Sequence, residues 1–94
     1  MEKETLKASK STNVHDLAGA IAGIVGKGAV CEVISIGAAA LNQSIKATII
    51  ARKMLSSSGV NLVITPAFVN VAVNNRDTGE PEEITGVKLI TVVM

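Results

Sequence analysis

Aromatic residues are almost absent from this chain: it has no Trp, no Tyr and a single Phe, Phe68. A module that binds single-stranded nucleic acid by stacking bases on several aromatic side chains is therefore not expected. Cysteine is equally scarce, and the lone Cys31 cannot close an intramolecular disulfide. Together with the lack of a secretory signal pattern, this predicts a cytoplasmic location in a reducing environment.

Charged residues make up only 18% of the 94 residues, whereas hydrophobic residues make up 48%. This balance predicts one folded domain over residues 1–94. The most apolar stretch, residues 18–41, is interrupted by Lys27 and Glu32. A membrane-spanning helix needs about 20 unbroken apolar residues, so no membrane association is expected.

The few charges are unevenly placed, although the formal net charge is only +1. Residues 33–76 contain four basic residues and no acid, and residues 77–83 contain four acids and no base. A basic middle followed by an acidic loop allows one surface to attract an anion. Solvated helix faces often show the same pattern, so both interpretations stay open at this point.

Residues that could carry catalysis or bind a metal are isolated from one another. His15 has no matching Cys, Ser or carboxylate set, and Cys31 falls in a buried strand pattern, where a thiol is inert. Metal-ligand spacing is absent, and Gly37 opens a helix without the further glycines of a nucleotide-binding loop. We therefore expect a binding protein without catalytic residues, metal, cofactor or small-molecule substrate.

Hydrophobic periodicity predicts six elements in the order β-α-β-α-β-β. Strands are expected over residues 5–9, 29–36, 60–73 and 87–93, helices from 14 to a stop at 27–28 and from 38 to 55, and a polar hairpin loop over 74–83. Right-handed crossovers place both helices on one face of a mixed four-stranded sheet, which defines a two-layer α/β fold. Pro66 interrupts the alternation of the third strand, which predicts a bulge or an edge position there.

Two features of this arrangement predict contacts beyond the two layers. The second sheet face has no element left to cover its valines, so a partner subunit is expected, in a homodimer or a tetramer. The first helix carries Gly19, Gly23 and Gly26, which weaken a helix interior. These glycines predict either a close contact inside the domain or a flank that a subunit or a ligand approaches.

The starts of the two helices form a candidate binding edge, because in β-α-β-α-β folds both begin at the same side of the sheet. Lys10 and Ser11 come just before the first helix, and Asn42, Gln43 and Lys46 lie in the first turns of the second. Helix starts offer unpaired N–H groups and a partial positive charge, which suit phosphate. The sequence therefore predicts an anion-facing edge, although capping and solvation explain each residue singly.

Six segments of the chain carry a family resemblance. They are residues 6–9 (LKAS), 17–23 (LAGAIAG), 35–47 (SIGAAALNQSIKA), 50–52 (IAR), 66–68 (PAF) and 87–90 (VKLI), and they occur in order along nearly the whole chain. Together they resemble the signature of the stage V sporulation protein S family. The loop over residues 74–83 departs from the family pattern, because it is longer and more acidic.

That family resembles Alba chromatin proteins and the C-terminal domain of translation initiation factor 3. The resemblance implies an Alba-like fold with strand order 1-2-4-3, a dimer, a role in spore development, and binding of DNA or RNA. The nucleic acid would meet the helix-start residues Lys10, Asn42, Gln43 and Lys46, and Arg76 in the hairpin arm. The expected function is a nucleic-acid-binding regulatory or architectural protein. The alternative is a structural assembly module that binds other proteins in spore development.

Overall fold

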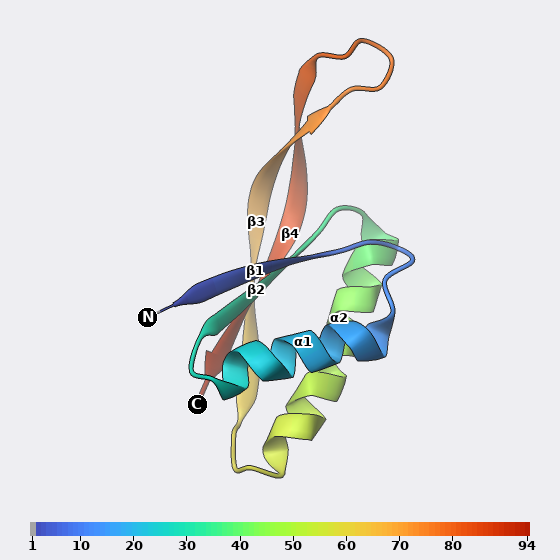
Figure 1. The fold of residues 1–94 in the computed structure, drawn as a ribbon. Helices are drawn as coiled ribbons and strands as arrows, with labels where there is room; N and C mark the ends of the chain where they lie inside the picture. Colours follow the sequence, from blue (N-terminus) through green and yellow to red (C-terminus); the bar gives the residue numbers. More distant parts are fainter. Residues whose placement is uncertain (1) are drawn as a thin grey trace.

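The computed structural model describes residues 2–94 and contains four strands and two helices (Figure 1). The elements are β1 (Lys3–Ala8), α1 (Val14–Gly26), β2 (Val30–Ser35), α2 (Ala38–Ser56), β3 (Leu62–Asn74) and β4 (Pro81–Val93). They follow the predicted β-α-β-α-β-β order. Neither of the helices in this part of the chain is long and apolar enough to cross a membrane.

The four strands form one mixed sheet in the order β1-β2-β4-β3. β1 runs parallel to β2, and β4 runs antiparallel to both β2 and β3, so β1, β2 and β3 all point the same way. Both helices pack on one face of this sheet (Figure 1). The predicted two-layer α/β architecture and the strand order 1-2-4-3 are therefore confirmed.

The hydrophobic core lies between the helices and the sheet face that they cover. α1 turns Leu17 and Ile21 into this core at helical spacing. Its start is capped by Asn13, whose Oδ1 accepts a hydrogen bond from Asp16 N at 3.0 Å, as Asn at this position predicts. α2 buries mainly small residues, namely Ala40, Ser44, Ala47, Thr48 and Ala51. These small side chains let α2 lie close to its neighbours.

Strand alternation divides the remaining side chains between two faces of the sheet. Cys31, Val33 and Leu89 point toward the helices and are buried. We call the other side the open face, because no helix or strand within residues 2–94 covers it. By register, the open face carries Lys3, Lys7, Glu32 and Lys88 together with Ile34, Val69, Val71, Val73, Ile84 and Ile90.

The β3–β4 hairpin reaches well beyond the rest of the sheet. The β2–β4 ladder ends at Ser35 and Val87, whereas the β3–β4 ladder continues to Asn74 and Pro81. We call the projecting part, residues 69–86, the arm. Its six residue pairs extend about 20 Å past β2, at about 3.3 Å per residue. The arm makes the molecule elongated, with extents of 50 × 27 × 17 Å (Figure 1).

Pro66 causes no bulge, because the β3–β4 register is the same on both sides of it. The bulge that the sequence allowed is therefore wrong, and the other option, an edge position, is the one observed. An edge strand tolerates a residue without an N–H, since its outer side pairs with nothing in the sheet. The hydrophobic residues of β3 change from one face of the sheet to the other near Pro66, because the helices cover only the first part of this strand.

The hairpin loop covers residues 75–80, which is shorter than the predicted 74–83, because Asn74 still pairs with Pro81. Local hydrogen bonds close this short loop. Asn75 N–H donates to Glu80 O at 2.9 Å, and Asn75 Oδ1 accepts from Asp77 N at 2.8 Å. This Asx turn lets the flanking polar residues pair as strand, although their composition is typical of a loop.

Gly19, Gly23 and Gly26 do not form the close contact inside the domain that was one of the two predicted alternatives. All three are exposed, and no neighbouring atom lies within 4 Å of the place where a Cβ would stand. The core-facing side of α1 is formed by other residues, such as Ala18 and Ile21. The glycines therefore leave one side of α1 flat and open.

Candidate nucleic-acid interface

The two helix starts lie together at the edge where β1 and β2 end. Because these strands are parallel, the segments that follow them leave the sheet on the same side. Gln43 in α2 bridges the two segments, since its Nε2 donates to the backbone oxygen of Thr12 at 2.9 Å. We call this surface the helix-start edge; it comprises Lys10, Ser11, Asn42, Gln43 and Lys46.

The segment before α1 is a turn held by hydroxyl groups. Ser9 N–H donates to Thr12 Oγ1 at 2.8 Å, and Thr12 N–H donates to Ser9 O at 3.2 Å. The hydroxyls of Ser9 and Ser11 lie 3.2 Å apart. Lys10 is exposed within this turn, four residues before α1 begins. The turn therefore fixes the backbone from which the Lys10 ammonium extends.

α2 starts without a side-chain cap. Gly37 precedes it with a φ of 89°, a left-handed conformation that favours glycine, and offers no side chain to accept a hydrogen bond. Ala38 and Ala39 follow and are exposed, so the N–H groups of the first turn are open to an anion. Asn42 and Lys46 are also exposed and lie one turn apart on the same side of α2.

A buried hydroxyl pair fixes the position of α2 against β2. The side chains of Ser35, at the end of β2, and Ser44, in the second turn of α2, hydrogen-bond to each other in the core. Ser44 Oγ also lies 3.2 Å from the backbone oxygen of Ala40, to which it donates. The placement of Asn42 and Lys46 at the sheet edge is therefore set by packing rather than by a flexible loop.

Lys10 and Lys46 are available to an external anion. Neither forms an ion pair within residues 2–94; the ion-paired lysines in that range are Lys3, Lys27 and Lys88. Asp16 is the one acidic residue in the first turn of either helix. The helix-start edge thus combines two cations, two helix starts and hydroxyl and amide donors with a single carboxylate.

Arg76, the sixth predicted site residue, lies apart from the helix-start edge. It is in the loop over residues 75–80, at the far end of the arm and about 20 Å past the last β2–β4 pair. The arm tip, residues 76–83, holds one base against four acids, which gives it a net charge of −3. The structure therefore groups five of the six predicted residues and separates Arg76 from them.

One contribution to this edge could have been expected from the sequence but was not: the Nε2 of Gln43 connects the two helix starts, although the sequence suggested only that Gln43 faces a ligand. The open N–H groups at the start of α2 were expected from the sequence. Gly37 at the N-cap position leaves them open, where Ser, Thr, Asp or Asn would have satisfied one of them.

Within residues 2–94, the chemically reactive side chains either lie away from the helix-start edge or do not group into a catalytic or metal site. Burial, with a smaller contribution from the charges of Glu4 and Glu32, raises the pKa of the Cys31 thiol to about 11. A thiol held protonated in this way is a poor nucleophile. His15 is exposed on α1. Within residues 2–94, no group of three His, Cys, Asp or Glu side chains could hold a metal ion.

The fold is shared with a solved Alba protein. Alba from Thermoplasma volcanium matches with a TM-score of 0.67, over 94% of this chain and 98% of that chain, at 7% sequence identity. At such low identity the likeness establishes the fold alone, and it agrees with the Alba-like architecture expected from the sequence.

Family membership comes from the sequence itself. The family model described as Stage V sporulation protein S matches residues 4–94. This match includes all six strands and helices, the helix-start edge and the arm, with only the first residue of β1 outside it. The chain therefore belongs to the stage V sporulation protein S family.

Proposed function

We propose that this protein binds the phosphate backbone of nucleic acid at the helix-start edge, as a regulatory or architectural protein in spore development. The observation that carries the proposal is the hydrogen bond from Gln43 to Thr12, which joins the turn that carries Lys10 to the first turns of α2, where Lys46 lies. Membership of the stage V sporulation protein S family supports the developmental role. The fold shared with an Alba protein agrees with the resemblance to Alba chromatin proteins noted from the sequence.

Phosphate suits this edge for electrostatic and hydrogen-bonding reasons. Lysine ammonium groups neutralise backbone phosphates whatever the base sequence, and the N–H groups of a helix start donate hydrogen bonds to them. The Ser11 hydroxyl and the Asn42 amide add further donors. Binding at this edge is therefore expected to depend strongly on salt and weakly on sequence, for DNA or for RNA.

We also propose that the protein acts as a homodimer or a tetramer, because the open face leaves valines and isoleucines uncovered in a single chain. A dimer carries two helix-start edges and therefore two copies each of Lys10 and Lys46. Two edges on one particle contact more phosphates than one, which raises both the affinity and its dependence on salt.

Salt dependence tests the binding proposal. Each phosphate neutralised contributes about −0.9 to the slope of log K against log salt concentration on duplex DNA. Lys10→Ala combined with Lys46→Ala removes two lysines from each of two chains, so the slope should flatten by roughly 2–4 units. The measurement is a fluorescence-anisotropy titration at several salt concentrations, on single- and double-stranded DNA and RNA.

Arg52→Ala combined with Lys53→Ala is the matched control, because it removes the same charge from exposed positions near the other end of α2. It should flatten the slope by roughly one unit or less. Lys27 is a poorer control, since its Nζ lies 2.6 Å from Glu4 Oε2 and its loss would break an ion pair. An equal loss in the control would mean diffuse binding. Absence of salt-dependent binding to all four nucleic acids would refute the proposal.

A second candidate function, a structural assembly module, is favoured by exposed apolar side chains along α2 and the edge strand β3. Phe68 is 83% exposed and Ile49 is 62% exposed. A cavity of about 330 Å³ is lined by Pro66, Ala67, Phe68 and Val87. Apolar association strengthens or is unchanged as salt rises, whereas phosphate binding weakens steeply, so the same salt series distinguishes the two functions.

A further inference from the structure

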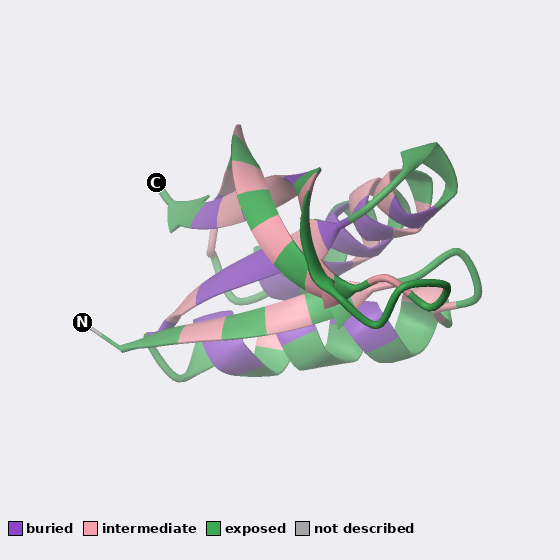
Figure 2. Ribbon diagram, turned by 90° about the horizontal axis from the view of Figure 1, so that it is seen from above, coloured by how far each residue is buried: buried purple, intermediate pink, exposed green. Residues whose placement is uncertain are grey.

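The arm has an apolar side that no other part of residues 2–94 covers. Val69, Val71 and Val73 alternate along β3 with more exposed residues such as Asn70 and Ala72 (Figure 2). An isolated two-stranded ribbon is marginally stable in water, and an edge strand with a row of valines favours association. The arm therefore has the pattern of a strand pair that packs against a second surface.

The apolar side of the arm continues into the open face of the sheet. Val71 and Val73 line a cavity of about 260 Å³ together with Lys7, Ile34 and Ile36, which come from the ends of β1 and β2. Arm and sheet therefore present one connected surface. A partner that covers the arm will also reach the open face of β1 and β2.

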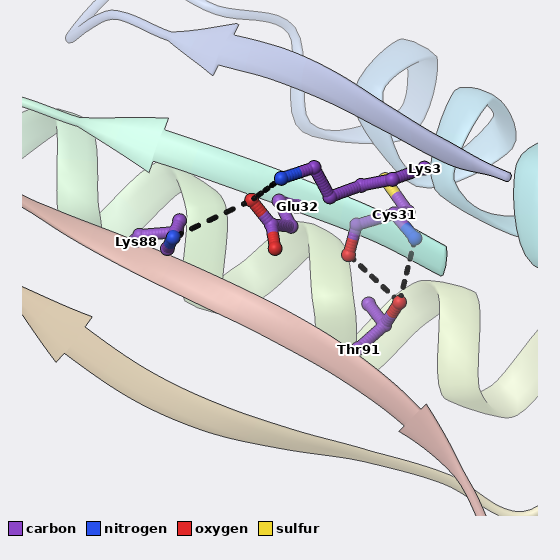
Figure 3. A network of polar contacts seen from close by, with 5 residues as sticks. All are labelled: Lys3, Cys31, Glu32, Lys88 and Thr91. Carbon is purple, nitrogen blue, oxygen red and sulfur yellow. Dashed lines mark hydrogen bonds and ion pairs between the residues drawn. The ribbon is translucent and has the colours of Figure 1, made fainter. Parts of the chain in front are cut away.

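The two ends of this surface carry opposite charges. The arm tip, residues 76–83, has a net charge of −3. On the open face, Lys3 and Lys88 lie 3.7 Å and 3.6 Å from the same oxygen of Glu32 (Figure 3). These two lysines and one carboxylate give this end of the surface a net charge of +1.

The length of the arm matches the sheet that it would have to cross. The arm has six residue pairs, and β1 and β2 have six residues each, so both measure about 20 Å. Stacked sheets pack about 10 Å apart with interdigitating side chains, which leaves room for one layer of valines. A second copy of this chain therefore fits the surface in both length and charge.

We propose that the open face of each chain is covered by the arm of a second copy, and that the acidic arm tip of one copy meets Lys3 of the other, at the end of the open face opposite to that copy's own arm. In this two-fold arrangement the arms run antiparallel and bury their valines against the partner's sheet. The two helix-start edges, from which the arms rise, then lie near the centre of the dimer. The acidic tips are held at the far ends of the open faces, where they do not repel phosphate at the helix-start edges.

A charge-swap experiment tests this arrangement without nucleic acid, so it depends on the proposed self-association and not on the proposed binding function. One variant carries Glu80→Lys, Glu82→Lys and Glu83→Lys in the arm tip. The other carries Lys3→Glu on the open face. Each variant alone sets like charges against each other, so its dimer dissociation constant should rise about tenfold or more at low salt. An equimolar mixture restores opposite charges at both contacts and should recover dimers.

Sedimentation velocity gives the dimer fraction, and circular dichroism checks that each variant is folded. The paired variant Arg52→Glu with Lys53→Glu, on α2, is the charge control and should leave the dissociation constant unchanged. Variants that dimerise like the parent chain, a mixture that recovers no dimers, or a parent chain that is monomeric at 100 μM would each overturn the proposal. Loss of nucleic-acid binding with intact dimers would count against the proposed function alone.

The apolar part of the contact is tested by two neighbouring substitutions on the arm. Val71→Asn places a polar amide on the side that the partner covers and should weaken the dimer about tenfold or more. Ala72→Asn makes the same amide on the opposite, exposed side and should leave the dimer intact. Equal effects of the two substitutions would mean that the valine side of the arm is not the interface.

Discussion

Gly86 shows, at the scale of a single residue, how closely β4 approaches β2 where the arm leaves the sheet. A Cβ at this position would stand 2.7 Å from the backbone oxygen of Ser35 and 3.2 Å from Ile36 Cγ1. The nearer atom belongs to the backbone, so the contact cannot be relieved by rotating a side chain. Sequence periodicity could not reveal this requirement, because a glycine within a strand is also compatible with a bulge.

Gly86→Ala should therefore destabilise the fold by about 1–3 kcal/mol, since a backbone shift is needed to accommodate one methyl group. Gly19→Ala is the matched control: this glycine is in the interior of α1 and has nothing within 4 Å of its added Cβ. It should stabilise the chain by about 0.5–1 kcal/mol through helix propensity. Urea unfolding measures both changes, and a neutral Gly86→Ala would contradict the close approach of the strands.

Cys31 gives a pH dependence whose sign follows from its raised pKa. The folded thiol ionises at about pH 11 and the unfolded thiol near its ordinary value of 9.0. Between these values the folded state holds more protons, so the stability that is present below pH 9 is lost as the pH rises through 11. Cys31→Ala should remove this component from urea-unfolding curves measured at pH 8, 9 and 10. Iodoacetamide should also label native Cys31 far more slowly than the unfolded chain at pH 8.

At the scale of elements, the sequence predicts what local periodicity determines and fails where distant strands decide the outcome. Both helices and the Asn13 cap follow from spacing and residue type, and they occur where expected. The end of the hairpin loop and the regular register at Pro66 depend on pairing between β3 and β4, which no local pattern contains. The helix-start edge was predictable because topology places it. The separation of Arg76 from this edge was not predictable, because it depends on how far the β3–β4 hairpin extends past the rest of the sheet.

Thr91 makes a contact between β4 and β2 that the sequence pattern does not predict. The β2–β4 ladder stops at Glu32 and Ile90, and the next pairing is made by a side chain. Thr91 Oγ1 accepts from Cys31 N at 3.0 Å and donates to Cys31 O at 2.7 Å, inside the protein (Figure 3). One hydroxyl therefore satisfies both backbone groups of Cys31 in place of a backbone pair.

Thr91→Val should destabilise the protein by about 1–3 kcal/mol for each backbone group of Cys31 left unsatisfied, although the substitution preserves shape. Thr91→Ser keeps the hydroxyl and should lose much less. Thermal unfolding of the two variants measures the difference. Equal stability of the valine and serine variants would mean that β2 and β4 pair at this position without the hydroxyl.

At the scale of the whole molecule, the structure separates a compact body from an arm that has no core of its own. The body holds the buried cluster, which comes mainly from α1, β2 and α2, whereas no residue between 69 and 85 is buried. The charges are divided in the same way: the lysines that form no ion pair within residues 2–94 lie on the body, and four acidic residues lie at the arm tip. A chain built in this way presents complementary surfaces at its two ends, which favours assembly of identical copies.

Self-association is therefore the expected property of the intact protein. Light scattering at micromolar concentration should give at least twice the chain mass of 9.6 kDa. The open face supplies the reason, since its valines and isoleucines lose contact with water only when a second surface covers them. A chain that kept its monomer mass up to 100 μM would contradict this expectation, because its open face would then stay exposed to water.

The arm also restricts how the length of this chain can change. Side chains alternate along each strand, so removing one residue from both strands turns every side chain beyond the cut to the opposite side. Removing two residues from both strands shortens the arm by about 7 Å and leaves the valines aligned. Insertions and deletions that preserve function should therefore come in steps of two paired positions in the arm, while the loop over residues 75–80 can change by single residues.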